Sequence, residues 1–301
     1  MTLLVGCPVE GSSTGAIRLA VMLARPGENL VVVAVLSNPW TPGMARVDSE
    51  YQSFLDARAD DALEQARSEL PGDVSATFVR RHARSVSAGL LEVAEHHDAR
   101  LIVLGSSTSG MLGRVALGGV GERLLHSSPR LVALAPRGFR CTAARVTRVT
   151  AAYGGGEQSE HLVLAAAAQA EQIGAALRLA SFAVRPRSTI LAGIGSRGED
   201  GVVQEWMHEM AKRARETVAV VAQLPQPPSI DPSQIGRGIT WEDAMNDVEW
   251  IDGDVLVVGS SNHGPLAQVF LGARASKIIR HCPVPVVVVP RGQAPVQRNV
   301  V

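Results

Sequence analysis

Lysine is nearly absent from this chain. Of its 301 residues only Lys212 and Lys277 are lysines, so most loops lack the lysine with which many phosphate-binding loops hold their ligand. Basic and acidic residues number 29 each, and the formal net charge is zero. Aromatic residues make up only 4% of the chain. Without a basic excess or an aromatic surface on which bases stack, the sequence indicates neither a nucleic-acid partner nor an anionic membrane surface.

Cysteine and long apolar runs are also scarce. Cys7, Cys141 and Cys282 are isolated, and no CxxC pair or cysteine–histidine cluster occurs. They therefore predict no metal site and no disulfide framework, and indicate reduced, buried thiols. The apolar run at residues 2–5 is too short for a secretory signal, and no run approaches the roughly 20 apolar residues of a membrane helix. We expect a cytoplasmic protein.

A repeat is the strongest signal in the sequence. Residues 101–110 recur at 255–264, with an offset of 259 − 105 = 154, and the match continues without a gap as far as residues 138 and 292. A period of about 150 residues indicates a duplicated domain, because solenoid repeats are much shorter. The length also favours two domains. We expect one domain over residues 1–140 and a second over residues 145–292.

Strand and helix patterns alternate in each half. The predicted strands are 3–5, 30–36, 74–79, 101–104 and 131–135 in the first half, and 146–152, 176–182, 218–223, 255–258 and 285–289 in the second. The predicted helices include one capped by Ser12 or Ser13, one over about 49–70, and one that opens at Thr240 with a capping box completed by Asp243. Fully apolar strands in this order predict an α/β protein. Each half is a five-stranded, mainly parallel, doubly wound sheet with helices on both faces.

Loops that follow the first, second and fourth strands are candidate sites, because ligands of such sheets bind beyond the carboxyl ends of the strands. After the fourth strand of the second half, Gly259–Gly264 is glycine-rich, and Gly272 opens the next helix. Free N–H groups and the helix dipole there favour an anion such as phosphate. A tight turn that needs glycine for its geometry explains the same residues equally well. The run Tyr153–Gly156 is a weaker candidate, because such runs are more often flexible turns.

These residues resemble the universal stress protein family. The segments that match its C-terminal signature are Val257–Gly264, Phe270-Leu-Gly272 and His281–Pro290, and the first half repeats them with Val103–Ser106, Leu117-Gly118 and His126–Pro129. The resemblance implies the family's nucleotide-binding fold in both halves. It also implies that the halves pair across their last strands, for which residues 285–290 supply an edge. A homodimer and an unidentified protein partner stay open.

Both candidate phosphate loops depart from the family's ATP-binding motif, G-x2-G-x9-G-[ST], in the same way. The second glycine and the final hydroxyl residue are replaced by Thr108 and Gly119 in the first half and by Asn262 and Ala273 in the second. The Asp that such members carry after their first strand corresponds to Pro8 and to about Tyr153. The candidate residues of these degenerate loops are Gly105, Ser106, Thr108, Gly110, Gly118 and Gly119, and Gly259, Ser260, Asn262, His263, Gly264, Gly272 and Ala273.

The lost groups weaken the case for a bound nucleotide. A hydroxyl hydrogen bond to a charged partner contributes about 1.5–3 kcal/mol, so each loss lowers affinity by about one to two powers of ten. We expect a non-catalytic universal-stress-type protein that acts in the stress response by ligand sensing or partner binding, with no firmly bound cofactor. The alternative is a protein that binds ATP or AMP at low occupancy, with weak ATPase or switch activity. An enzyme of the wider nucleotide-hydrolase superfamily would rest on fold alone, because no nucleophile–base arrangement is visible.

Overall fold

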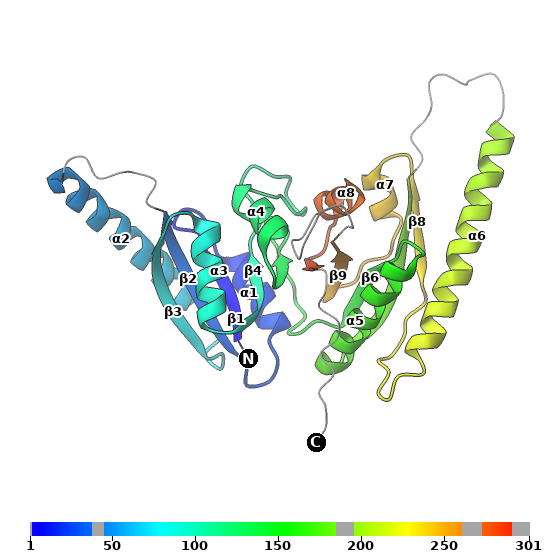
Figure 1. Cartoon of the computed structure of the whole chain (residues 1–301), viewed down its shortest axis with the longest axis horizontal. Coiled ribbons are helices and arrows are strands. Elements are labelled where there is room, and N and C mark those ends of the chain that lie inside the picture. The colour runs from blue at the N-terminus through cyan, green and yellow to red at the C-terminus, as the bar shows by residue number, and fades with distance from the viewer. Residues whose placement is uncertain (1, 38–44, 185–195, 261–272, 291–301) are drawn as a thin grey trace.

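Ten strands form one continuous sheet in the order β3-β2-β1-β4-β5-β10-β9-β6-β7-β8 (Figure 1). The computed structural model describes residues 2–37, 45–184, 196–260 and 273–290. Neighbouring strands are parallel within each half, so each half is the predicted five-stranded doubly wound sheet. The second half repeats the strand order of the first, as the 154-residue repeat requires.

The two halves use equivalent elements. In the first they are β1 (Thr2–Cys7), α1 (Thr14–Leu23), β2 (Asn29–Ser37), α2 (Ala45–Ser68), β3 (Ala76–Ala83), α3 (Val86–His96), β4 (Ala99–Leu104), α4 (Gly119–Ser127) and β5 (Leu131–Leu134). In the second they are β6 (Arg148–Ala152), α5 (Glu157–Ile173), β7 (Ala176–Val184), α6 (Ser196–Val221), β8 (Gln234–Gly238), α7 (Trp241–Asn246), β9 (Asp254–Gly259), α8 (Ala273–His281) and β10 (Val286–Val289).

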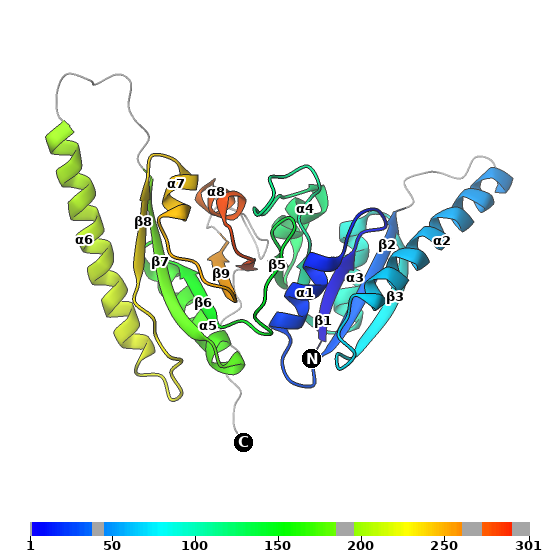
Figure 2. The ribbon, with the colours of Figure 1, turned by 180° about the vertical axis from the view of Figure 1, so that it is seen from behind.

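Helices cover both faces of the sheet, because alternate residues of each strand supply two separate apolar cores. On β1, Leu3 and Val5 belong to the core that α1, α2, α5 and α6 cover. Leu4 belongs to the other, which α3, α4, α7 and α8 cover. Figure 2 shows the same layers from behind, with the long helices α2 and α6 at the outer ends. The continuous runs of valine and leucine in the strands follow from this double coverage.

The halves meet at their last strands, which confirms the pairing that the family resemblance implied. Strands β5 and β10 are antiparallel, with Val286 opposite Leu134 and Val288 opposite Val132. All four side chains are buried. The duplicated chain thus closes two sheet edges against each other, and the edges of the combined sheet are β3 and β8.

The linker between the halves is fastened to both of them. Arg18 on α1 donates a hydrogen bond to the Cys141 carbonyl oxygen at 2.7 Å. From the second half, the Asp252 carboxylate accepts hydrogen bonds from the Cys141 thiol at 2.8 Å and from the backbone N–H groups of Thr142 and Ala143 at 2.8 and 3.0 Å. These bonds lower the pKa of Asp252 to about 2. Charged and polar contacts therefore fix the linker's path.

One local prediction needs correction. The predicted strand at residues 218–223 is wrong, because α6 continues to Val221 and the edge strand β8 begins only at Gln234. Of the two serines predicted to cap α1, Ser13 is at the N-cap without a side-chain bond, and the Ser12 hydroxyl accepts a hydrogen bond from the Thr14 N–H at 3.2 Å. The capping box of Thr240 and Asp243 on α7 is confirmed. Within the described ranges, no helix is long and apolar enough to cross a membrane.

Candidate functional site

The first-half loop between β4 and α4 is tied down close to where it starts. The Ser106 hydroxyl donates to the Ala135 carbonyl oxygen at 2.6 Å and accepts from the Ala116 N–H at 3.0 Å. The Ser107 N–H donates to the Ala116 carbonyl oxygen at 2.9 Å. These bonds anchor the loop after Gly105 and bring it back on itself just before α4 begins.

The glycines of this loop serve its folding. A Cβ atom added to Gly110 would lie 2.0 Å from the Ala116 Cβ atom, so only glycine fits there. Residue Gly118 is the N-cap of α4, and a Cβ there would lie 3.3 Å from the Ser107 Cβ. Around Gly119, in contrast, no atom lies within 4 Å of an added Cβ. Packing therefore accounts for two of the candidate glycines, whereas Gly119 has room for a side chain.

Thr108 lies where the first and fourth loops approach each other. Its Cγ2 methyl is 3.9 Å from the position that a Cβ on Gly11 would take. Gly11 itself has φ +102°, a conformation that favours glycine, in the turn that follows β1 and Pro8. The position that is glycine in the family's motif is thus partly filled here.

Charge also disfavours an anion at two of the three helix starts considered. Helix α4 carries Glu122 in its first turn, and α5, which follows the Tyr153–Gly156 run, carries Glu157 and Glu160. Each carboxylate offsets the positive end of its helix and repels a phosphate. The first turn of α8 has no acidic residue and contains Arg274. The start of α8 is therefore the most favourable of the three for an anion.

In the second half an aromatic ring fills the position after the first strand. Tyr153 directly follows β6, is only 4% exposed, and its hydroxyl lies 3.0 Å from the Thr217 hydroxyl on α6. The neighbouring Gly155 carbonyl oxygen accepts a hydrogen bond from Arg213 at 2.8 Å. Within the glycine run, Gly155 is thus packed against α6, whereas Gly154 and Gly156 are exposed.

Only part of the second predicted phosphate loop can be placed. Gly259 ends β9, and the Ser260 N–H donates to the Val289 carbonyl oxygen at 3.2 Å. Ala273 is exposed as the first residue of α8. The other predicted residues, Asn262, His263, Gly264 and Gly272, lie outside the described residues, as do the loops after β2 and β7.

The thiols are buried, as predicted, and each is free. Burial raises the pKa of Cys7 to about 11 and that of Cys282 to about 12, so both are protonated at neutral pH. No group of three or more His, Cys, Asp or Glu side chains among the described residues could hold a metal ion. The thiols therefore belong to the packing of the two cores.

Sequence reasoning missed several residues that shape these sites. The position of Glu122 in the first turn of α4 could have been predicted from the sequence, because Glu122 follows Gly118 by four positions. Residues Arg213 and Thr217 gave no such signal, because their roles depend on how α6 packs over the loop after β6. The structure brings Thr108 together with the first loop, and it places Tyr153 away from solvent.

Known proteins resemble the chain over nearly its whole length. The family model described as the universal stress protein family matches residues 2–136 and again 145–290. A universal stress protein of Mycobacterium tuberculosis is 35% identical over 295 residues, which covers 96% of this chain and 100% of that protein. A universal stress protein of Mycobacterium bovis matches to the same extent.

Solved structures share the fold at lower sequence identity. A universal stress protein from Archaeoglobus fulgidus superposes with a TM-score of 0.60 at 17% identity, over 96% of this chain and 97% of that one. A putative universal stress protein from Pseudomonas aeruginosa gives 0.53 at 14% identity, over 96% and 93%. The chain therefore belongs to the universal stress protein family, with two family domains in tandem.

Proposed function

We propose that this chain is a non-catalytic, cytoplasmic universal stress protein whose nucleotide sites are degenerate, and that it acts by ligand sensing or partner binding. The observation that carries this proposal is the Thr108 methyl group, 3.9 Å from the Cβ position of Gly11 in the opposing loop. The first-turn carboxylate of Glu122 acts in the same direction, because it offsets the positive end of α4, although Arg280 at 3.2 Å compensates part of its charge.

The second half supports the same proposal for a different reason. The ring of Tyr153 is buried and hydrogen-bonded to Thr217, and it stands where ATP-binding members carry an Asp. Because α6 packs against this segment through Arg213, a nucleotide would have to displace well-ordered protein contacts. These contacts support the proposal that the loop after β6 holds no nucleotide.

A second candidate function is a low-affinity ATP or AMP switch centred on the second half. The observation that favours it is the first turn of α8, which lacks acidic residues and contains Arg274. A switch of this kind would retain part of its nucleotide after purification or saturate at ATP or AMP concentrations near those in cells.

One experiment separates the two functions. The purified protein is denatured, and any released nucleotide is identified by mass spectrometry and compared with the amount of chain. The proposal expects less than a tenth of a nucleotide per chain, as a rough threshold, since each missing contact lowers affinity about tenfold or more. Release of one ATP or AMP per chain would refute it and favour the switch.

A variant that reverses the substitutions provides the positive control. In the first half, Pro8→Asp, Thr108→Gly and Gly119→Ser restore the family's motif, and the structure accommodates all three. Pro8 is exposed, Thr108→Gly removes the obstructing methyl, and Gly119 has open space around it. Matched changes are not tolerated in the second half, because Tyr153→Asp would bury a carboxylate and leave a cavity.

A further inference from the structure

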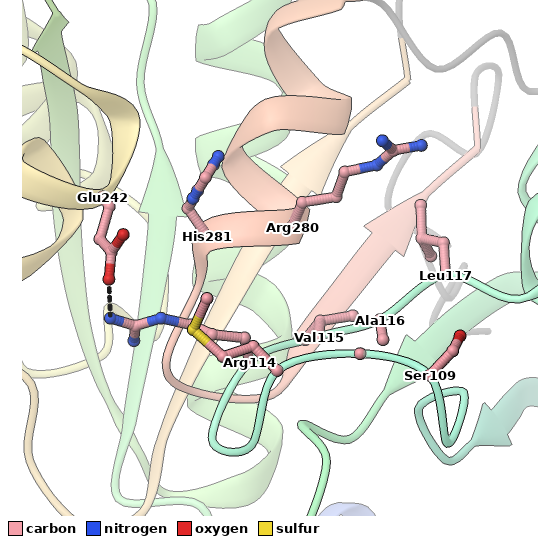
Figure 3. A pocket seen from close by; sticks show the side chains of 10 residues that line it. Ser109, Arg114, Val115, Ala116, Leu117, Glu242, Arg280 and His281 are labelled. Carbon is pink, nitrogen blue, oxygen red and sulfur yellow. Dashed lines mark ion pairs between the residues drawn. The ribbon is translucent and has the colours of Figure 1, made fainter.

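A cavity of about 320 Å³ lies between the two halves (Figure 3). One wall is the first-half loop from Ser109 to Leu117. The other carries Glu242 of α7 together with Arg280 and His281 at the end of α8. Because these walls belong to different halves, the pairing of β5 with β10 creates the cavity. Gly110 of the candidate phosphate loop lines it, whereas Gly11 and Thr108 do not.

Basic side chains of both halves line this cavity. Arg114 donates a hydrogen bond to the Asn246 side-chain oxygen at 2.8 Å, and its guanidinium lies 3.8 Å from the Glu242 carboxylate, the ion pair drawn in Figure 3. Arg280 extends from α8, and its guanidinium lies 3.2 Å from Glu122 on α4. Both arginines therefore hold glutamate carboxylates across the boundary between the halves.

Those glutamates are replaceable partners. Glu242 is 47% exposed and Glu122 is 48% exposed, and exposed ion pairs contribute little free energy. Since the planar guanidinium matches a carboxylate in geometry, a ligand carboxylate can take the place of either glutamate. The hydrogen bond to Asn246 meanwhile keeps Arg114 in position.

The remaining lining is apolar. Val115, Ala116 and Leu117 face the cavity, and Met111 beside them is 65% exposed, which is unusual for a large apolar side chain. The cavity volume is at the lower end of the roughly 300–1,000 Å³ found for small-molecule sites. A ligand that fits is therefore small and has a short apolar body beside its acidic group.

The basic set occurs on one side only. With the 154-residue offset, the repeat partners of Arg114, Arg280 and His281 are Gln268, His126 and Ser127. A homodimer of identical domains would present the same residues twice. In the fused chain both arginines line this one cavity, whereas the positions equivalent to them by the repeat are Gln268 and His126, so a single site could specialise after the duplication.

We propose that this cavity binds a small organic acid, with its carboxylate held by Arg114 in place of Glu242 and its apolar body against the Met111–Leu117 segment. This inference rests on the ligand-sensing part of the proposed function and deepens it. Binding exchanges the Arg114–Glu242 contact for a ligand contact, and so it changes how the 109–117 loop is held to α7.

The test titrates the full chain with hexanoate, hexanol and inorganic phosphate, and follows amide chemical shifts by NMR. Hexanoate should saturate at millimolar concentration, with shifts confined to residues 109–117, 242–246 and 280–281. Hexanol lacks the charge and phosphate lacks the apolar body, so each should bind about tenfold more weakly. Equal binding of hexanol or of phosphate would overturn the proposal, as would the absence of saturation by hexanoate.

Three variants sharpen this test. Arg114→Gln should weaken hexanoate about tenfold. Glu242→Gln should strengthen it about two- to fivefold, because Arg114 loses a competing carboxylate. Arg81→Gln removes an arginine–glutamate pair on the outer strand β3 and should leave binding unchanged. Equal losses in Arg114→Gln and Arg81→Gln, or weaker binding in Glu242→Gln, would contradict the site.

ATP titrated in parallel keeps the two proposals separate. Saturation by ATP with shifts at Gly11 and Thr108 would refute the degenerate nucleotide site. That result would leave the proposal for the cavity standing, provided that hexanoate still binds there and the variants change its affinity as described above.

Discussion

Asp254 is the carboxylate at the centre of a buried ionic cluster in the second half. Its side chain is fully buried, bonded to Arg148 at 2.9 Å and to the Thr150 hydroxyl at 3.1 Å, and 3.5 Å from Arg178. Arg178 is also buried and stacks over the Trp250 ring at 5.1 Å. Two guanidinium groups therefore depend on one carboxylate, with Asp231 as a partly exposed second partner of Arg148.

Replacing that carboxylate should be costly. Asp254→Asn removes the charge that compensates two buried cations, so the free energy of unfolding should fall by about 3 kcal/mol. Urea denaturation followed by circular dichroism measures it. As a control, Glu92→Gln breaks the exposed pair with Arg81 and should change stability by less than about 1 kcal/mol. Similar effects of the two substitutions would mean that the cluster contributes no more than a surface pair.

The linker carboxylate of Asp252 predicts a pH dependence. Its folded-state pKa is lowered from 3.8 to about 2 by hydrogen bonds from Cys141, Thr142 and Ala143. The stabilisation is therefore fully present above the unfolded-state pKa and is lost as the pH falls from about 4 through 2. Because the group is exposed, the contribution is about 1 kcal/mol.

Thermal unfolding at pH 7 and pH 3 tests this expectation. Asp252→Asn should lower the melting temperature at pH 7, and the difference from the unmodified chain should shrink at pH 3. A difference that is unchanged between the two pH values would show that the carboxylate's charge has no role in holding the linker.

At the scale of elements, most strands could be predicted from the sequence, because a strand that helices cover on both faces is apolar throughout. Residues 30–36 and 101–104 are such runs, and both are strands. The β-branched segment 218–223 misled the prediction. Its residues continue the stripe of Met210, Ala214, Thr217 and Val221, which are buried at helical spacing along α6. Tertiary packing thus prevailed over strand propensity.

The edge strand β8 had almost no sequence signal, because Gln234–Gly238 contains two glycines and no apolar alternation. The structure explains them. A Cβ on Gly236 would lie 2.0 Å from the Ala244 carbonyl oxygen, so the helix α7 packs directly on the strand backbone. Of the candidate sites, sequence could identify the degenerate motif, but not the contacts of Arg114 or Tyr153, which depend on elements far along the chain.

This close approach makes Gly236→Ala a test of the α7–β8 packing. The added methyl meets backbone, which cannot move aside as a side chain can, so stability should fall by about 2 kcal/mol. Gly201→Ala on α6 has open space around it and should stabilise the chain slightly, by about 0.5 kcal/mol. Chemical denaturation of both variants gives the comparison, and an unaffected Gly236→Ala would contradict the described packing.

For the whole molecule, duplication gives one continuous sheet with two sites that differ. In the first half, Thr108 lies beside the loop after β1, and Glu122 lies in the first turn of α4. In the second half, Tyr153 is part of the packed core. Pairing through β5 and β10 adds the cavity between the halves, which one domain alone lacks. Fusion in one chain therefore lets each half change without changing the other.

Calorimetric titration of ATP into the unmodified chain and into the Pro8→Asp, Thr108→Gly, Gly119→Ser variant tests the central claim most directly. The account predicts no saturation of the unmodified chain below about 1 mM and, in the variant, a gain of at least about tenfold from the restored contacts. Saturation of the unmodified chain at micromolar ATP, with no gain in the variant, would contradict it.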